Sequence, residues 1–264
     1  AWGEKHSQPV RVVVMDKNSG PAAARNRGME LATTRYVAFL DSDDEHIRDT
    51  LDTLCSALDK HPSAVMSFGD ATVVTQTSRV SQGLFAPRVH LNQVAIAIDS
   101  DMFVLQDAKD LLLPASVIPT CATCFRREDA LAVGGMPEEF RSGEDWLFFL
   151  RLTERGQFIF TTRDLARVHR HSENLTSPRA AEFVAREKLK GLMALKNRKI
   201  GVTLCAEQHR RVESMLETQQ KHWLYHLSRL GLTAYMRGKR ISETNHSSLR
   251  HLLRATAASL NLLK

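Results

Sequence analysis

The stretch Asn18–Glu45 has the sequence NSGPAAARNRGMELATTRYVAFLDSDDE. Its alanine-rich part, Pro21–Thr33, predicts a helix, because alanine has a high helix propensity and proline suits a first turn. Arg35–Leu40 is short and apolar and predicts a strand. That strand delivers four acidic residues within the five positions Asp41–Glu45, and carboxylates placed so closely repel one another. Something in the fold must therefore offset that repulsion.

The residues on either side of this stretch predict alternating strands and helices. Arg11–Met15, RVVVM, is continuous and β-branched and predicts a buried strand. His46–Lys60 predicts a helix, with apolar residues at helical spacing at Ile47, Leu51, Leu54 and Leu58. Ala64–Phe68 and Ala71–Val74 predict two further strands. The order strand–helix–strand–helix–strand indicates an α/β sandwich with parallel strands.

The chain changes character near residue 178. Before it, we expect a strand, a helix stopped by a Gly-Gly turn, an amphipathic helix and two more strands, at Ala115–Arg127, EDALAVGG, Ser142–Arg155, QFIFTT and LARVHRH. After it, helices are expected over Ala180–Lys196, Ala206–Leu230 and Ser247–Leu263. Residues 179–264 also hold 17 Lys and Arg against 6 Asp and Glu. We therefore expect an α/β domain over residues 1–178 and a basic helical region over residues 179–264.

The composition excludes several classes of protein. A hydrophobic fraction of 43% and a charged fraction of 25% are those of an ordinary globular protein. No apolar run approaches the roughly 18 residues that a membrane span needs. Four cysteines in 264 residues indicate reduced thiols and a cytoplasmic setting. Cys121 and Cys124 form a C-x-x-C without a second such pair, so small buried thiols are favoured over a zinc site.

Carboxylates and histidines form two motifs that could carry chemistry. Asp41 and Asp43 follow a strand two residues apart, point to one side, and suit a hard divalent cation that also binds phosphate oxygens. An acidic turn that caps a helix starting near His46 is an equally open interpretation. His169 and His171 alternate along a strand, as metal ligands, a proton-transfer pair or surface residues. The pattern alone favours the surface interpretation for the histidines.

The segment Gly143–Leu152, GEDWLFFLRL, has two interpretations as well. Ser142 and Asp145 have the spacing of a capping box at a helix start, which alone would explain the aspartate. In the functional interpretation, Asp145 or Glu144 is a general base at a helix N-terminus. That location favours the charged carboxylate that a base must be.

The turn before the first predicted helix suits an anion. Gly20 stands in front of the helix N-terminus, where Arg25 and Arg27 add positive charge. Ser19 or Asn18 is expected to cap the helix. No lysine follows a second glycine here, so the turn does not match a Walker phosphate loop.

In combination and order, these motifs resemble family 2 glycosyltransferases, which have the GT-A fold. Asn18–Glu45 resembles the sugar-nucleotide half of that family, with its Asn-x-Gly turn, Ala-Arg-Asn helix, apolar strand and D-x-D-D. CFRREDALAVGGMPEEFRSGEDWLFFLRLTERG looks like the acceptor-side segment, and ARVHRHSENLT is similar to the closing strand. The resemblance covers about residues 10–178. It implies a Rossmann-like α/β/α sandwich with a mixed, mainly parallel sheet, followed here by a C-terminal helical extension.

The resemblance also implies roles for single residues. The donor would be held by Asn18, Gly20, Arg25, Asp41 and Asp43. The metal, Mn²⁺ or Mg²⁺, would be bound by Asp43 and His171. On the acceptor side, Asp145 would deprotonate the acceptor hydroxyl, while Glu144 and Trp146 would shape the pocket.

The implied reaction moves a sugar from a nucleoside diphosphate sugar to a hydroxyl of a surface polysaccharide, a lipopolysaccharide or another glycan precursor. A metal would stabilise the leaving diphosphate, and a single base without a second nucleophile predicts inversion. In the family's layout Arg11–Met15 matches the third strand, so an opening strand–helix–strand segment of about 40–60 residues is expected to be missing. The alternative is a truncated, non-catalytic relative that binds nucleotide sugars or serves as a scaffold.

The basic helical region leaves the choice of partner open. Nucleic acid is the least favoured, because few aromatic residues interleave the basic ones. We expect these helices to pack on the domain and to contact an anionic membrane, where a lipid-linked acceptor would sit. The corresponding location is the cytoplasm, with peripheral attachment to the inner face of the membrane.

Overall fold

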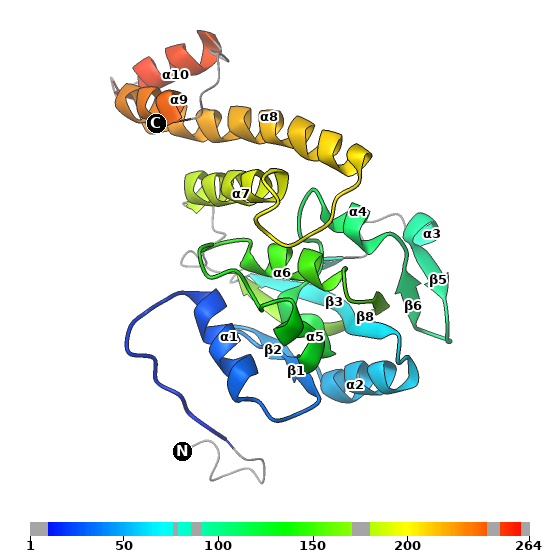
Figure 1. The fold of residues 1–264 in the computed structure, drawn as a ribbon. Coiled ribbons are helices and arrows are strands. Elements are labelled where there is room, and N and C mark those ends of the chain that lie inside the picture. The colour runs from blue at the N-terminus through cyan, green and yellow to red at the C-terminus, as the bar shows by residue number, and fades with distance from the viewer. Residues whose placement is uncertain (1–9, 76–78, 86–90, 171–179, 242–248, 260–264) are drawn as a thin grey trace.

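The computed structural model describes residues 10–75, 79–85, 91–170, 180–241 and 249–259. Its centre is an eight-stranded sheet with the order β1-β7-β3-β8-β6-β5, in which β2 also pairs with β8 and β4 with β3 (Figure 1). The strands are β1 Tyr36–Ala38, β2 Glu45–His46, β3 Ala64–Thr75, β4 Arg79–Gly83, β5 Ala95–Ala97, β6 Phe103–Leu105, β7 Thr123–Arg126 and β8 Gln157–Arg170.

The sheet is mixed, as predicted, but it is not mainly parallel. The two long central strands, β3 and β8, run parallel from the pair Ala64 and Gln157 to the pair Thr75 and Arg170. The other pairings among the described strands are antiparallel. The prediction counted strand–helix–strand units, whereas β7 and the short edge strands join the sheet through hairpin-like or long connections that reverse direction.

Helices cover both faces of the sheet. Before residue 170 these are α1 Pro21–Leu31, α2 Thr50–Lys60, α3 Leu91–Val94, α4 Ala108–Leu112, α5 Arg127–Ala132 and α6 Glu144–Leu152, with a 3₁₀ turn at Thr120–Ala122. After it follow α7 Ala181–Lys196, α8 Ala206–Arg229, α9 Leu232–Ile241 and α10 Leu249–Ser259. Figure 1 shows α7 between α6 and α8, so the C-terminal helices stack outward from one face of the sheet.

Side-chain alternation along β8 explains the two layers. Phe158 and Phe160 point into the larger core, which includes α6 and residues of α7 and α8. Ile159, between them, packs with Leu54 and Leu58 of α2 on the opposite face. Successive residues of a strand face opposite sides, so one apolar run serves both cores.

The largest departure from the sequence prediction is at Arg11–Met15, which forms no strand. Val12 is 83% exposed and Val14 is 86% exposed. A strand must satisfy its backbone groups against a neighbour, and no described strand lies beside this segment. The β-branched residues of this segment therefore have a high strand propensity, but the segment does not form a strand.

Other elements differ in extent. Each of the pairs of strands predicted over residues 64–74 and over residues 157–171 is one long strand, β3 and β8. Helix α2 begins at Thr50 rather than His46. Of its predicted apolar positions, Leu54 and Leu58 are buried and Leu51 is exposed. Helix α9 was not predicted, whereas α1, α5, α6, α7, α8 and α10 confirm predicted helices.

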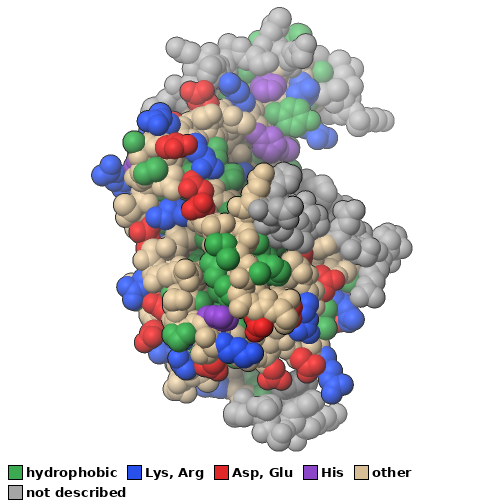
Figure 2. Space-filling view, turned by 90° about the vertical axis from the view of Figure 1, so that its right-hand side faces the viewer, with side chains coloured by type: hydrophobic (Ala, Val, Ile, Leu, Met, Phe, Trp, Pro, Cys, Tyr) green, Lys and Arg blue, Asp and Glu red, His purple; other side chains and the backbone are tan. Residues whose placement is uncertain are grey.

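No helix in the described ranges is long and apolar enough to cross a membrane. On the face shown in Figure 2, basic and acidic side chains are interspersed around a group of hydrophobic ones. The division at residue 178 stays a prediction, since residues 171–179 lie outside the described part.

Candidate active site

Helix α1 begins at a glycine turn. Gly20 has a φ of 90° and directly precedes the helix, whose first residue is the predicted Pro21. The predicted caps are wrong, because no side chain caps the helix and the Asn18 Oδ1 atom instead accepts the Gly20 backbone N–H at 3.1 Å. A Cβ on Gly20 would lie at ordinary contact distance, 3.4 Å, from the Arg141 Cδ atom, so the φ of 90° rather than a lack of space favours glycine here.

Asn26 ties α1 to the Gly-Gly turn that precedes α6. Its Nδ2 atom donates to the Met136 carbonyl at 2.9 Å, and its Oδ1 atom accepts the Met136 N–H at 2.8 Å. Gly135 has a φ of 65°, and a Cβ there would lie 2.6 Å from the Asn26 Oδ1 atom. The Ala-Arg-Asn and Gly-Gly motifs, far apart in the sequence, are therefore two halves of one contact.

The acidic cluster after β1 does not start a helix, so its interpretation as an acidic turn that caps a helix starting near His46 is wrong. The Asp44 carboxylate accepts the backbone N–H of His169 at 3.1 Å. Glu45 lies in β2 and accepts a bond from Arg167 at 3.1 Å. The repulsion is offset by partners on β8 and, for Asp41, by Arg25. The dipole of α2 does not contribute, because α2 begins only at Thr50.

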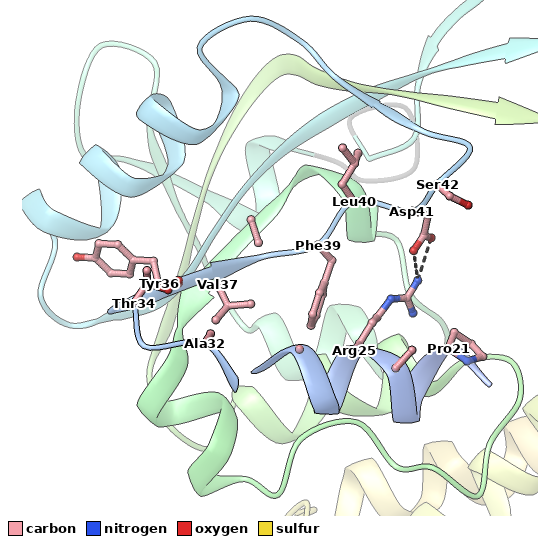
Figure 3. A pocket seen from close by; sticks show the side chains of 13 residues that line it. Pro21, Arg25, Ala32, Thr34, Tyr36, Val37, Phe39, Leu40, Asp41 and Ser42 are labelled. Carbon is pink, nitrogen blue, oxygen red and sulfur yellow. Dashed lines mark hydrogen bonds and ion pairs between the residues drawn. The ribbon is translucent and has the colours of Figure 1, made fainter. Parts of the chain in front are cut away.

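Arg25 joins the two halves of the site. Its Nη2 atom lies 2.7 and 2.8 Å from the two Asp41 carboxylate oxygens, a contact drawn in Figure 3, and its Nη1 atom lies 2.8 Å from the Glu144 Oε1 atom. The guanidinium carbon also lies 5.7 Å from the centroid of the Phe39 ring. Burial alone would lower the pKa of Arg25, but the carboxylates of Asp41, Glu144 and Asp145 raise it.

Glu144, the first residue of α6, is a buried carboxylate. Its side chain is 8% exposed. Asp41, the other carboxylate bound to Arg25, has a side chain that is 45% exposed. Burial, and next the charge of Asp145, raise the pKa of Glu144 to about 7, although Arg25 lowers it. Arg25 thus holds a carboxylate that would otherwise be neutral over a still wider pH range.

Asp145 is held differently. Its Oδ2 atom accepts the Thr120 hydroxyl at 2.7 Å, and its Oδ1 atom accepts the Trp146 backbone N–H at 2.7 Å. The capping-box interpretation is wrong, because Gly143, with a φ of 80°, precedes the helix and no side chain caps it. Asp145 is only partly buried, so a carboxylate oriented by two donors remains accessible at the start of α6.

Trp146 lies behind these carboxylates. Its indole is 4% exposed and donates from Nε1 to the Leu112 carbonyl at 2.6 Å. It therefore supports the site from the core, and any part in shaping the acceptor pocket stays a prediction. Its ring also contacts α7, where a Cβ on Gly191 would lie 2.7 Å from the Trp146 Cζ3 atom.

Of the two residues predicted to bind a metal, the structure describes one. Asp43 lies at the exposed turn next to Asp41, and His171 lies outside the described residues. Carboxylate oxygens are the ligands that Mn²⁺ and Mg²⁺ accept, so the donor type fits. In the described ranges no three His, Cys, Asp or Glu side chains form a group that could hold a metal. These residues thus fit only part of a coordination sphere, the remainder of which phosphate oxygens would complete.

A cleft of about 560 Å³ runs between α1 and residues 36–42 (Figure 3). Small residues of the helix side, Ala24, Gly28 and Ala32, leave the space open. Arg25 and Asp41 stand together at one end of it.

Two supporting residues, Thr120 and Arg141, had no signal in the sequence. Thr120 precedes β7 in the run PTCAT, where nothing marks it as a partner of a carboxylate 25 residues away. The C-x-x-C cysteines are confirmed as buried free thiols, and burial raises the pKa of both.

Comparisons with known proteins agree with this geometry. A family model described as glycosyl transferase family 2 matches residues 3–128. The pre-mycofactocin glycosyltransferase of Mycobacterium tuberculosis is 33% identical over 156 residues, which are 56% of this chain and 29% of that protein. The amylovoran biosynthesis glycosyltransferase AmsB of Erwinia amylovora is 27% identical over 163 residues, which are 61% of this chain and 50% of that protein. The chain thus spans half or less of these curated relatives.

A solved structure shares the fold. The mannosyltransferase PcManGT of Pyrobaculum calidifontis, in complex with GDP-Man and Mn²⁺, superposes with a TM-score of 0.52 at 17% identity. The match covers 100% of this chain and 66% of that one. The family model covers just under half of the chain, so the chain is similar to glycosyl transferase family 2 over residues 3–128, and its fold is GT-A.

Proposed function

We propose that this chain is a glycosyltransferase that moves a sugar from a nucleoside diphosphate sugar to a hydroxyl of a glycan, with inversion at the anomeric carbon. The observation that carries the proposal is the Arg25 bridge. One guanidinium binds Asp41, on the donor side of the motif pattern, and Glu144, on its acceptor side. A transferase needs these two sides adjacent, because the acceptor must attack the donor within one site.

Asp145 is the proposed general base. It is partly exposed and oriented by Thr120 and its own helix N-terminus, whereas Glu144 is buried and bound to Arg25. A sugar hydroxyl is a weak nucleophile, so a carboxylate must accept its proton as the bond to the anomeric carbon forms. One base without a second nucleophile corresponds to a single displacement.

The donor would lie along the cleft between α1 and residues 36–42. The Asn18–Gly20 turn and the start of α1 offer backbone N–H groups and the positive end of a helix to a diphosphate. We propose that Asp43 and His171 hold Mn²⁺ or Mg²⁺. When bound, the metal would act as a Lewis acid that stabilises the leaving diphosphate.

The acceptor is proposed from what the relatives are named for. AmsB is named for amylovoran biosynthesis, which favours a polysaccharide precursor over a protein acceptor. The basic helices after residue 178 would then form a second region beside the transferase domain, in contact with an anionic membrane. Cytoplasmic location with peripheral attachment belongs to the same proposal.

The test is binding and transfer measured separately. Calorimetry with UDP and with GDP, each with and without Mn²⁺, should show metal-dependent binding of one nucleotide. A panel of nucleoside diphosphate sugars with a mixed glycan acceptor should then show transfer, which Asp145→Asn should reduce by at least about a hundredfold. The matched control Asp52→Asn changes an exposed carboxylate of α2 and should leave both unchanged.

The alternative is a non-catalytic relative that binds nucleotide sugars or serves as a scaffold. Nucleotide binding that Mn²⁺ strengthens, without transfer to any acceptor, would favour that alternative. Transfer that survives Asp145→Asn would instead remove Asp145 as the base while leaving the enzyme proposal intact.

A further inference from the structure

A second cavity lies among the C-terminal helices, away from the Arg25 site. It has a volume of about 550 Å³ and is lined by α7, α8, the residue after α8 and α9. This is within the range of about 300–1,000 Å³ common for small-molecule sites. We call it the helical groove.

The walls of the helical groove are apolar. Its hydrophobic lining is formed by Leu189, Met193, Trp223, Leu227 and Leu230. Two of these side chains are left in contact with solvent, since Met193 is 48% exposed and Leu230 is 65% exposed. A Cβ on Gly238 would lie 2.1 Å from the Leu227 Cδ1 atom, so α9 crosses α8 closely beside the groove.

The charges around the groove are mostly positive. Arg186, Lys190 and Arg237 line it against a single acid, Glu182. The Glu182 carboxylate already accepts the Trp223 indole N–H at 2.7 Å. Lys190 and Arg186 lie 2.7 and 3.9 Å from the Glu187 Oε1 atom, while Arg237 is exposed on α9, so the cations still exceed the acids by one. An apolar floor with excess cations is complementary to an amphiphile whose head group is anionic.

The groove and the candidate active site share a helix. On its other side α7 contacts the segment that leads to Glu144 and Asp145, since the Glu187 carboxylate accepts the Arg141 backbone N–H at 3.0 Å. Gly191 of α7 packs against the Trp146 ring. One helix diameter, about 10 Å, therefore separates the groove from α6.

We propose that the helical groove binds a lipid phosphate, a long hydrocarbon chain that ends in a phosphate or diphosphate, as the carrier of the acceptor. The chain would lie against Trp223 and Leu230, and the head group would meet Arg237, Arg186 and Lys190. The identification as an acceptor carrier rests on the proposed transferase function. Lipid binding itself does not, because the groove residues are separate from Arg25, Asp41 and Asp145.

The test is binding of decyl phosphate to the full chain, below its micelle-forming concentration and without nucleotide or metal. Decanol and inorganic phosphate are the matched ligands that lack the head group and the tail. Decyl phosphate should bind at least about tenfold more tightly than either, because only decyl phosphate contacts both the apolar side chains and the cations of the groove. Arg237→Glu and Leu230→Gln should each weaken binding by about fivefold or more.

Two control variants lie outside the groove, one on α8 and one on α10. Lys221→Glu changes an exposed charge of α8 equally, and Leu253→Gln changes a 62% exposed leucine of α10. Both should bind decyl phosphate within twofold of the unchanged chain. All four altered positions are exposed, so thermal unfolding should show that the variants are folded.

Several results would overturn the proposal. These are no saturable binding, equal binding of decanol or phosphate, or equal weakening by Lys221→Glu and Arg237→Glu. Binding to phosphatidylglycerol vesicles that the groove variants do not alter, without binding of monomeric decyl phosphate, would show a general membrane surface and also overturn it. Because no sugar donor is present, each result is independent of whether transfer occurs.

Discussion

Replacing Arg25 by Met should destabilise the fold by an amount that grows with pH. The variant keeps an apolar chain of similar length but leaves Glu144, with a side chain 8% exposed, without its cation. In the unchanged chain the pKa of Glu144 is about 7, raised from the value of 4.5 for an ordinary glutamate. Because Arg25 lowers that pKa, its removal must raise it further.

The sign follows from proton binding. Between pH 4.5 and 7 the folded chain holds a proton on Glu144 that the unfolded chain has released, so this group's contribution to the free energy of unfolding falls as pH rises. In Arg25→Met the same fall continues above pH 7. For each unit by which Arg25→Met raises the pKa of Glu144, up to the pH of measurement, the loss in free energy of unfolding at pH 8 exceeds the loss at pH 5 by about 1.4 kcal/mol.

The expected magnitudes can be compared directly. At pH 5 the variant loses the half-exposed Asp41 pair and one hydrogen bond to Glu144, about 1–2 kcal/mol together. At pH 8 the ionised, buried Glu144 adds at least about 1 kcal/mol to that loss. Urea unfolding at both pH values, in metal-free buffer, measures each difference.

Two further variants isolate the cause. In a Glu144→Gln background, Arg25→Met should cost the same at pH 5 and pH 8. Arg35→Met removes an exposed ion pair with Asp59 and should cost less than about 1 kcal/mol at either pH. The reasoning is refuted if the cost of Arg25→Met is independent of pH, or if its pH dependence persists without the Glu144 carboxylate.

Three other predictions concern packing and thiols. Gly191→Ala should lower the free energy of unfolding by about 1–3 kcal/mol in urea unfolding, because its Cβ would lie 2.7 Å from the ring of Trp146 on α6. The control Gly28→Ala has nothing within 4 Å of the added Cβ and should not lower the free energy of unfolding. Equal effects of the two variants would argue against the contact. Arg126→Met should cost about 2–4 kcal/mol in the same assay, since its buried guanidinium donates to three backbone carbonyls, and a neutral result would contradict that network. A thiol reagent should label exposed Cys205 rapidly and Cys124, which is 1% exposed, only on unfolding; early labelling of Cys124, located by mass spectrometry, would be inconsistent with the core.

The helices were predictable because their signals are local. Alanine content, glycine stops and apolar spacing placed α1, α5, α6, α7 and α8 close to their observed bounds. The long strands were not, because polar residues interrupt their apolar runs. In β3, Asp70 is buried and accepts the backbone N–H groups of Ala71 and Phe85, a partner 15 residues away that no local pattern reveals.

The site divides in the same way. Residue types that the proposed reaction requires, such as Arg25, Asp41 and Asp145, stand out in the sequence by their motif order. Their partners do not, because Thr120 bonds to Asp145 and His169 bonds to Asp44 only after distant segments meet. The acidic cluster was therefore recognised, but its neutralisation by β8 and α1 in place of a helix was not.

The parallel pairing of β3 with β8 also bears on how the chain reaches its fold. Ala64 of β3 pairs with Gln157 of β8, so the centre of the sheet joins two segments between which all elements from β4 to α6 lie in the sequence. Contacts so distant in sequence must bear the entropy of closing a long loop before they contribute stability, and they slow folding. During synthesis, β3 must leave the ribosome long before β8 exists, so the edge of β3 that pairs with β8 stays unpaired while its other edge can pair with β4 and β7. This predicts that nascent chains ending before β8 are the species most prone to aggregate or to recruit chaperones.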